Sequence, residues 1–500
     1  MKSTIILKNY ATKIFSSGVS LLLGFVVTPF LLKYLGKDDF ALFRISNEWL
    51  STFSIFENAL SIAILAIFAK STDEHRDQNT WYSFKSYFKY AFIFMFFSMA
   101  FIPFLPKLYT IPVDKVNIVR IGFFIGSLNF LLLPFATFRC WLEFKEKSYL
   151  LSSARVFQNL LTAVLSMLLA YISFGIIGQF SSVLIGNIFF SLISFYLFQK
   201  FKSNFNFSKI SRMEMRDVNM NIHKLNFDGL IISFCGRISF LTDTVLLGFY
   251  FHPTKILPYV LSQRLILMIQ ENLQSIGNAS WASLLDYYRR GEQERFEKNL
   301  ISISRVSNFI AVIFLTPLLV LNKDFIHLWV GEEYYYGLSL TIIASLNAYL
   351  RSNFSMWGWC LSGNGNIKAQ VKIETINAAI NISTSILLTA TIGFLGPALG
   401  TLFGCMTVYS LLFPLALKNN LNLNLGKLYN ALYAPLLWAT PLFAIFYFFK
   451  DYMIITSWIK FGFFYAILAS FSLITIYLLG LNDDEKKYLQ NIVKSKFKKS

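Results

Sequence analysis

The sequence predicts an all-α integral membrane protein of about fourteen transmembrane helices, arranged as two six-helix bundles followed by two further helices. Composition is the first reason: 55% of the 500 residues are hydrophobic, 18% are aromatic and only 14% are charged. Such a composition excludes a water-soluble globular protein. The second reason is that apolar stretches of about 20 residues, the length that a helix needs to cross a bilayer, recur along the whole chain.

The predicted helices follow one another with short polar gaps, and no gap is long enough for a soluble domain. The first six are residues 11–32, 41–69, 84–105, 116–142, 152–173 and 176–199. The second six are 225–250, 256–284, 300–321, 338–361, 370–394 and 397–417, and the last pair is 430–449 and 455–480. The first stretch is longer than a signal-peptide core and lacks a small-residue cleavage site, so we expect it to be retained.

An internal repeat relates the two sets of six. The short loop FGIIG contains Gly175 and Gly178, and the loop GFLG contains Gly393 and Gly396. The number of residues from Gly175 to Gly393 equals the number from Gly178 to Gly396. Near the same interval two further pairs recur: Gly18 with Gly236, and Arg44 with Arg264. Repeated halves around a central site are typical of alternating-access transporters, in which the site opens to each side of the membrane in turn.

The repeat predicts five parts of the chain. They are an N-terminal lobe of six helices (1–205), a cytoplasmic linker (206–224), a C-terminal lobe of six helices (225–418), helices thirteen and fourteen (419–481) and a basic cytoplasmic tail (482–500). The linker and the tail are both rich in Lys and Arg, which suits segments on the inner membrane surface.

Basic residues predict the orientation of the helices. The N-terminus, the loops that follow even-numbered helices and the tail hold most of the Lys and Arg, including Arg139 and Arg155 near the inner helix ends. The positive-inside rule therefore places both termini in the cytoplasm. Attraction of these loops to anionic membrane lipids also accounts for the net charge of +18, so no nucleic acid partner is needed.

Once the basic residues of the inner and outer sides are set apart, five arginines remain within predicted helices: Arg44, Arg120, Arg237, Arg264 and Arg351. Arg237 and Arg351 lie near helix midpoints, where a charge costs at least about 2.5–3.5 kcal/mol unless it faces protein or water. The other three lie nearer the outer face. There the side chain can reach the interface instead, which is the alternative explanation for them.

Two predicted helices carry a wall of polar side chains. At about 100° per residue, one side of helix 256–284 gathers Gln263, Arg264, Gln270, Glu271, Gln274, Ser275 and Asn278. One side of helix 41–69 gathers Arg44, Asn47, Glu48, Ser51, Ser54 and Asn58. Walls of this size favour a water-filled central cavity, because one facing helix offers too few partners. The alternative is that these groups tie helices together.

Carboxylates near these walls are candidates for ion coupling. Asp243 and Arg237 point to opposite sides of helix 225–250, so they cannot pair with each other. The expected partner of Arg237 is Glu57, Glu271 or a ligand. Asp243, Glu48 and Glu271 are candidates to bind a proton or Na⁺ and bias the two conformations of a transporter, or to act as counter-ions of the arginines.

No motif indicates an enzyme, a cofactor or a metal site. The phosphate-binding pattern G-x-x-x-x-G-K-[ST] is missing, and GNGNIK near Gly363 lacks its spacing. The four Cys are scattered over different helices, and the four His show no metal-ligand spacing. We therefore expect a transporter without a cofactor, with H⁺ or Na⁺ as the candidate coupling ion.

Three segments carry a family resemblance. The first has an apolar helix ending in Pro, a basic-Tyr-Leu-Gly turn, acidic residues and an aromatic-rich second helix: FVVTPFLLKYLGKDDFALFRISNEW. The others are FLTDTVLLGFY followed by YVLSQRL, and GNGNIKAQVKIETINAAINISTSILLTATIGFLGPALGTLFG. Over essentially its whole length the chain resembles the Wzx-type polysaccharide flippases, a branch of the MOP superfamily that includes the multidrug and toxic compound extrusion (MATE) transporters.

The resemblance implies a cargo. It is an undecaprenyl-diphosphate-linked glycan repeat unit, as of O-antigen, lipopolysaccharide or capsule, moved from the cytoplasmic to the outer leaflet of the bacterial inner membrane. A polysaccharide polymerase and a chain-length regulator are the candidate partners. Arg44, Arg264, Arg237 and Arg351 are expected to bind the diphosphate, because a guanidinium can donate two hydrogen bonds to its oxygens. Helix one holds no Arg, unlike in relatives that carry the peptidoglycan precursor, which argues against that precursor.

Three other functions stay open. A MATE-type cation-coupled drug or metabolite antiporter would need an acidic or aromatic cavity rather than several arginines. A membrane-embedded glycosyltransferase or O-antigen polymerase would need a large outer loop, whereas the longest one here is 322–337. A scaffold protein would have little use for polar walls inside its helices.

Overall fold

The computed structural model describes residues 2–52, 73–109, 111–202 and 243–481, with single positions at 57, 61, 64, 65, 68, 231, 235 and 486. All regular elements within these residues are helices, which confirms the predicted all-α class. The chain divides into two compact units, Met1–Ile256 and Leu257–Ser500, and each is described by itself. The predicted linker 206–224, most of helix 225–250 and most of the tail lie outside the described residues, so the five-part division stays a prediction.

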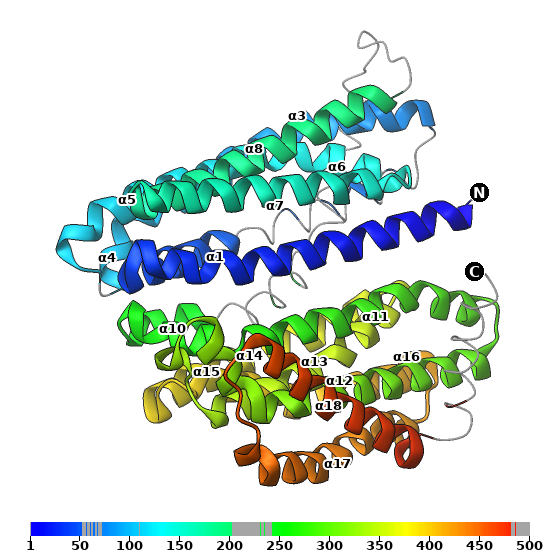
Figure 1. The fold of residues 1–500 in the computed structure, drawn as a ribbon. Coiled ribbons are helices and arrows are strands. Elements are labelled where there is room, and N and C mark those ends of the chain that lie inside the picture. The colour runs from blue at the N-terminus through cyan, green and yellow to red at the C-terminus, as the bar shows by residue number, and fades with distance from the viewer. Residues whose placement is uncertain are drawn as a thin grey trace. The chain divides into compact units, whose positions relative to one another are not determined.

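The first unit begins with a kinked helix, α1 (Lys2–Thr52), drawn in blue in Figure 1. Its helical geometry is interrupted at Gly36, with φ 80° and ψ 169°. Glycine reaches this left-handed region without strain, because it has no Cβ to clash with the backbone. The kink falls in the gap between the first two predicted helices, so α1 contains the first of them and the start of the second.

The other helices of the first unit follow the predicted order, with one difference. They are α3 (Asp73–Ala100), η1 (Ile102–Phe104), α4 (Leu105–Leu108), η2 (Val113–Lys115), α5 (Val116–Ser127), η3 (Leu128–Phe135), α6 (Ala136–Phe144), α7 (Ser148–Tyr171) and α8 (Gly175–Phe201). The predicted helix 116–142 is thus three pieces, with a 3₁₀ segment between two α-helices. Pro134 lies in that segment, where its ring and missing N–H disfavour a regular α-helix.

The predicted helices from 256–284 onward belong to the second unit, except that the first of them begins just before the boundary at Leu257. They are α10 (Pro253–Ser262), α11 (Arg264–Arg289), α12 (Gln293–Trp329), η4 (Glu332–Tyr334), α13 (Leu338–Gly363), α14 (Ile367–Ile392), α15 (Gly396–Gly404), the π-helix η5 (Cys405–Tyr409), α16 (Ser410–Leu421), α17 (Leu425–Phe449), η6 (Lys450–Tyr452), α18 (Trp458–Thr475) and the π-helix η7 (Ile476–Gly480). The predicted helix 256–284 is divided at Gln263, between α10 and α11.

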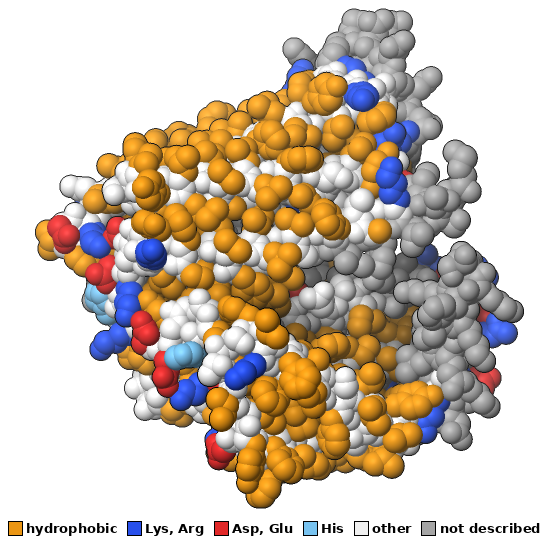
Figure 2. All heavy atoms as spheres, viewed as in Figure 1, with side chains coloured by type: hydrophobic (Ala, Val, Ile, Leu, Met, Phe, Trp, Pro, Cys, Tyr) orange, Lys and Arg blue, Asp and Glu red, His pale blue; other side chains and the backbone are white. Residues whose placement is uncertain are grey.

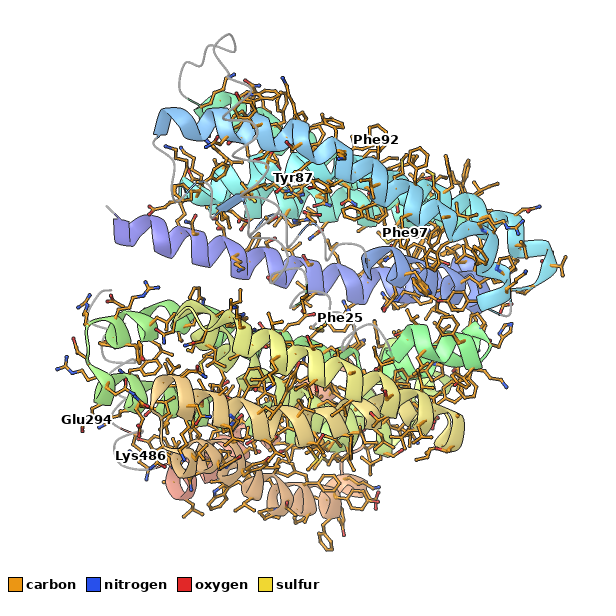
Figure 3. The ribbon with its side chains drawn as sticks, turned by 180° about the vertical axis from the view of Figure 1, so that it is seen from behind. Phe25, Tyr87, Phe92, Phe97, Glu294 and Lys486 are labelled. Carbon is orange, nitrogen blue, oxygen red and sulfur yellow. The ribbon has the colours of Figure 1, made fainter. Side chains whose placement is uncertain are left out.

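Among the described residues, ten helical segments are long and apolar enough to cross a membrane. Large apolar side chains are exposed on them, and hydrophobic side chains cover much of the visible face of each unit, with Lys and Arg gathered toward the helix ends (Figure 2). On α3, for example, Phe92 and Phe97 are exposed whereas Tyr87 is fully buried (Figure 3). Exposed apolar surface of this extent belongs in lipid. The chain is a multi-pass membrane protein.

Helix α17 is tied to α12 and α13 by hydrogen bonds to two of its backbone carbonyls, one of which a proline leaves available. Pro435 lies inside α17 and cannot donate to the carbonyl four residues earlier. That carbonyl, on Ala431, accepts a hydrogen bond from Asn308 Nδ2 of α12 at 2.8 Å, and the next one, on Leu432, accepts from the Tyr349 hydroxyl of α13 at 2.6 Å. The core thereby satisfies the polar groups that the proline exposes.

The sequence repeat is also visible in packing, in the helix pairs α7–α8 and α14–α15. Both pairs are joined by a turn with a left-handed glycine, Gly175 (φ 56°) and Gly393 (φ 83°). Farther along, Gly186 of α8 faces Thr162 and Gln158 of α7, while Gly404 of α15 faces Asn381 and Asn377 of α14. To within one position, the facing residues of the two pairs are related by the same interval as the two turn glycines. This agreement supports the two related six-helix bundles of the predicted fold class.

Candidate functional site

The first unit encloses a cavity of about 370 Å³ between α1, the α5–η3–α6 segment, α7 and α8. We call it the inner cavity. Polar groups line much of it: Asn47, Ser51, Glu57, Asn129, Arg139, Arg155, Asn187 and Ser191. Apolar side chains complete the wall, among them Leu50, Phe180 and Phe190. A few convergent polar groups on an apolar wall are typical of ligand sites, whose volumes are about 300–1,000 Å³.

Arg139 on α6 forms the ion pair of the inner cavity. Its Nη2 lies 2.5 Å from Glu57 Oε1, and the two side chains are 18% and 34% exposed. The guanidinium carbon also lies 5.6 Å from the centre of the Phe190 ring, within reach of a cation–π interaction. Glu57 therefore neutralises one cation of the cavity and holds its side chain in place.

Arg155 on α7 contributes a second guanidinium next to the first. Its Cζ lies 4.0 Å from the centre of the Phe190 ring, and its Nη1 donates a hydrogen bond to Gln158 Oε1 at 3.0 Å. Arg139, Glu57 and Glu143 all act electrostatically on Arg155. Its side chain is nevertheless accessible, so it can contact a ligand without first leaving its partners.

A relay of amide side chains continues from Arg155 along the wall. Gln158 Nε2 donates to Asn187 Oδ1 at 2.6 Å, Asn187 Nδ2 donates to Asn129 Oδ1 at 2.7 Å, and Asn129 Nδ2 donates to the Gly126 carbonyl at 2.9 Å. A guanidinium can only donate and a carbonyl can only accept, so the two ends assign the orientation of every amide between them. Amides held in this way suit the hydroxyl groups of a neutral polar ligand.

A second cavity, of about 650 Å³, lies on the other side of the two arginines. We call it the end cavity, because its lining includes Asn9 and Lys13 of α1 and Ser148 at the start of α7. Ser16, Ser17, Glu143 and Ser152 also line it. Arg139, Arg155 and Phe190 line both cavities. These three side chains therefore form the partition between them.

Three of the sequence-predicted residues belong to this site. They are Asn47, Ser51 and Glu57, all from helix 41–69, and they line the inner cavity. Arg44 lies one turn before Asn47 and forms a 3.9 Å ion pair with Glu48. The side chain of Asn58 and all of Arg237 lie outside the described residues. Helix 41–69 thus does contribute polar groups to a cavity.

Most of the remaining predicted residues belong to the second unit, whereas Asp243 belongs to the first. Arg264 is the first residue of α11 and is partly buried. Arg351 is 7% exposed on α13, and an electrostatic attraction links it to Glu374 of α14. Gln263 donates to the Tyr259 carbonyl at 3.2 Å. The convergence of these arginines with Arg44 stays a prediction, because Arg44 belongs to the other unit.

The rest of the predicted polar wall of helix 256–284 divides between buried and exposed positions. Gln270 is 3% exposed, Gln274 is partly buried, and Glu271 is exposed. The side chain of Asn278 lies outside the described residues. Asp243 is partly buried at the start of the described part of helix 225–250. The role of this wall and of these carboxylates in ion coupling stays a prediction.

Sequence reasoning missed Arg139 and Arg155 as site residues. It counted them among the basic residues of the inner side, on account of their place near helix ends. Two signals were present: Arg139 and Glu143 are four residues apart on one helix, and Arg155 is followed by Gln158 in an otherwise apolar stretch. Both spacings place polar groups on one helix face. No group of three or more His, Cys, Asp or Glu that could hold a metal occurs among the described residues.

Comparisons with known proteins give a relative and a fold. No protein-family model matches the sequence. Over 355 residues the chain is 23% identical to the uncharacterized membrane protein EpsK of Bacillus subtilis (strain 168), a match covering 67% of this chain and 66% of that protein. The matched part is thus just under two thirds of the length of that relative.

Solved structures of two kinds of transporter resemble this chain. The lipid II flippase MurJ, in an inward closed conformation, matches with a TM-score of 0.70 and 15% identity over 93% of this chain and 99% of its own. An inward-facing multidrug resistance MATE family transporter of the MOP superfamily matches with a TM-score of 0.63 and 14% identity over 83% and 95%. A MOP superfamily transporter from Pyrococcus furiosus matches with a TM-score of 0.56 and 13% identity over 84% and 95%. The chain has the fold that MurJ shares with the MATE transporters.

Proposed function

We propose that this protein is a transporter of the MOP superfamily that flips a diphosphate-linked oligosaccharide lipid across the bacterial inner membrane. The observation that carries the proposal is the pair Arg139 and Arg155, whose guanidinium groups line one cavity together with the amide relay. Two guanidinium groups can bind the oxygens of a diphosphate in a bidentate manner. The amides and hydroxyls beside them can hydrogen-bond the sugar hydroxyls.

The charge of the inner cavity favours an anionic cargo. Arg139 and Arg155 face one carboxylate, Glu57, which leaves an excess of positive charge. A charge inside a membrane-spanning bundle is costly, so it is retained where it has a function. The fold shared with MurJ, which by name is a lipid II flippase, supports the same class of cargo. Lys-rich and Arg-rich inner loops support cytoplasmic termini.

Several sequence-based assignments form part of this proposal. Arg44, Arg264, Arg237 and Arg351 remain candidate diphosphate ligands of the complete transport pathway. Wzx-type specificity, coupling to H⁺ or Na⁺, and partnership with a polysaccharide polymerase and a chain-length regulator also belong to it. The absence of an enzymatic role is proposed on the fold it shares with transporters.

A rescue experiment tests the proposal. The full chain is expressed in bacterial strains that lack their own polysaccharide flippase, and surface polysaccharide is measured by immunoblotting. Wild-type protein should restore the polysaccharide. Arg155→Gln should reduce rescue about 10-fold or more, the factor that corresponds to 1.4 kcal/mol of lost binding. The matched control is Arg295→Gln, which removes an exposed cation paired with Glu292.

Equal rescue by Arg155→Gln and wild type, at equal amounts of protein in the membrane, would contradict the role of Arg155. Failure of the wild type in strains that make several different repeat units would count against the cargo class.

A second candidate, a cation-coupled drug or metabolite antiporter, is favoured by one feature of the second unit. Glu374 of α14 is an acidic group within a candidate span, and it accepts a hydrogen bond from the Tyr409 hydroxyl at 2.5 Å. An acidic residue beside aromatic rings suits an organic cation, and MATE transporters share the fold. Ethidium efflux from cells expressing the chain, abolished by Glu374→Gln, would favour this candidate over the flippase.

A further inference from the structure

The end cavity is a pre-formed space at the end of the first unit where α1 begins. Asn9 of α1 makes two hydrogen bonds to the backbone of the turn between α6 and α7. Its Nδ2 donates to the Glu146 carbonyl at 3.0 Å, and its Oδ1 accepts from the Tyr149 N–H at 2.8 Å. Lys8 stacks on the Tyr149 ring at 3.9 Å. These contacts fix the wall next to the opening before any ligand arrives.

Charge makes this cavity a site for anions. Lys13, Arg139 and Arg155 line it, against one carboxylate, Glu143. All three cations act electrostatically on Glu143. Glu57 already neutralises Arg139 from the inner side, so Lys13 and Arg155 leave the end cavity with an excess of positive charge over Glu143. Fields of one sign in a cleft concentrate ions of the other sign and raise the rate of their capture.

The partition between the two cavities is held in place from both sides. Phe190 is 3% exposed and lies against both guanidinium groups. Glu57 holds Arg139 from the inner side, and Gln158 holds Arg155 through the amide relay. An anion in either cavity meets the same two arginines.

We propose that the end cavity is a separate docking subsite for a phosphate or diphosphate group, with Lys13 as the residue that distinguishes it from the inner cavity. The identification of this anion as the head group of a lipid-linked glycan rests on the proposed function. The binding of an anion at Lys13 does not, because it follows from the charges and the shape of the first unit. Lys13 captures the anion, and Arg139 and Arg155 hold it at the partition.

Equilibrium binding of inorganic pyrophosphate to the purified full chain in detergent tests this subsite. Lys13→Gln should weaken pyrophosphate binding about 3- to 10-fold, and Arg155→Gln about 10-fold or more, since each tenfold loss corresponds to 1.4 kcal/mol. Lys33→Gln, at an exposed position farther along the same helix, is the matched control. It removes a cation that lines neither cavity, and its binding should equal that of wild type.

A second variant keeps the test independent of the folding of Lys13→Gln. Ser152 lines only the end cavity, and Ser152→Asp places a negative charge there. Pyrophosphate binding should fall by at least as much as with Lys13→Gln, while Ser152→Asn should bind normally. Melting in detergent, followed by size-exclusion chromatography, confirms that the compared variants are folded.

Two outcomes separate this inference from the proposed function. Normal pyrophosphate binding by Lys13→Gln and Ser152→Asp, together with weak binding by Arg155→Gln, would place the anion in the inner cavity alone and overturn the subsite. The proposed function would then stand. Weak binding by Lys13→Gln and Ser152→Asp in a protein that rescues no polysaccharide would support the subsite and contradict the proposed cargo.

Discussion

The helix pairs α7–α8 and α14–α15 share a backbone plan but carry opposite charges. Arg155 on α7 and Glu374 on α14 are related by the same interval that relates Gln158 to Asn377 and Thr162 to Asn381 at the glycine contacts. Arg155 lies against the Phe190 ring, and Glu374 accepts a hydrogen bond from Tyr409. The repeated scaffold thus preserves its close helix contacts while the charge of the side chain that it presents changes sign.

A single inserted residue places Tyr409, the partner of Glu374, at the position equivalent to Phe190, the partner of Arg155. The stretch from Gly404 to Tyr409 is one position longer than the equivalent stretch from Gly186 to Phe190, and it contains the π-helix η5. A π-helix accommodates one extra residue in an α-helix and often marks a functional site. The insertion therefore restores the register between α14 and α16, and it brings the Tyr409 hydroxyl to Glu374.

The largest effect is expected when the first unit is given the same charge at this position as the second. Arg155→Glu should reduce polysaccharide rescue about 100-fold or more, because it loses a guanidinium and places a carboxylate beside Glu57 and Glu143 in an anion site. Rescue is measured by immunoblotting at matched membrane protein levels. Arg155→Lys, which keeps the charge but not the bidentate geometry, should lie between wild type and Arg155→Glu. Full activity of Arg155→Glu would contradict an anion site in the first unit.

Removing the Tyr409 hydroxyl, which donates to Glu374, tests how much this hydrogen bond stabilises the second unit. Tyr409→Phe should lower the free energy of unfolding by about 1.5–3 kcal/mol, the range for a hydrogen bond to a charged group. Thermal unfolding in detergent measures the effect. Tyr447→Phe, on an exposed ring of α17, is the control and should change little. If the two variants melt alike, the Tyr409 contact contributes nothing to stability.

The shared glycine contact should be less tolerant in the first unit than in the second. Gly186→Ala should cost about 1–2 kcal/mol of stability, because overpacking against Thr162 and Gln158 exceeds the gain in helix propensity. Gly404→Ala meets mainly the Asn377 side-chain oxygen, 2.7 Å from the added Cβ, and that side chain can turn aside. Denaturation midpoints compare the two. Adding Thr162→Ala should restore most of the loss at Gly186, and no restoration would point to another cause.

The smallest expected difference concerns two serines at equivalent positions of the repeat. Ser166 hydrogen-bonds the Gln179 side chain, whose Nε2 donates back to the Ser166 carbonyl at 3.1 Å. The Ser385 hydroxyl has two longer contacts, to Asn381 Oδ1 at 3.2 Å and to the Pro397 carbonyl at 3.4 Å. Ser166→Ala should therefore lower stability by about 1 kcal/mol and Ser385→Ala by less than about 0.5 kcal/mol. The same melting assay would refute the ranking if Ser385→Ala proved the more damaging.

Hydropathy predicted the helices better than their interruptions. Helix 152–173 corresponds to α7 and helix 300–321 lies within α12, because a bilayer-length apolar run has few alternatives to a helix. The 3₁₀ segment η3 and the turn at Gln263 were not predicted. Their cause is local backbone geometry and packing, to which a hydropathy average is insensitive.

The site was only half predictable for a related reason. Asn47 and Ser51 were found because polar residues on one side of helix 41–69 contrast with the apolar rest, and Glu57 was singled out as a candidate partner of Arg237. Arg139 and Arg155 were taken for interface cations, since depth along a helix does not tell which side faces a cavity. Inside a membrane the lipid-facing and protein-facing sides are both apolar, so one sequence lacks the contrast that would distinguish them.

Because each amide of the relay has a fixed orientation, replacing one side-chain nitrogen by oxygen would disrupt the hydrogen bonding along the wall of the inner cavity. Asn187 gives a hydrogen to Asn129 and takes one from Gln158. An aspartate at position 187 would have the same shape but no N–H group to donate to Asn129. The hydrogen-bond relay from Arg155 to the Gly126 carbonyl would therefore be interrupted at its middle. Asn129 and Asn187 line the inner cavity, and each commits only one of its two N–H groups to the relay. The second N–H group of each can donate to a hydroxyl group of a sugar, which makes this wall selective for the position of that hydroxyl.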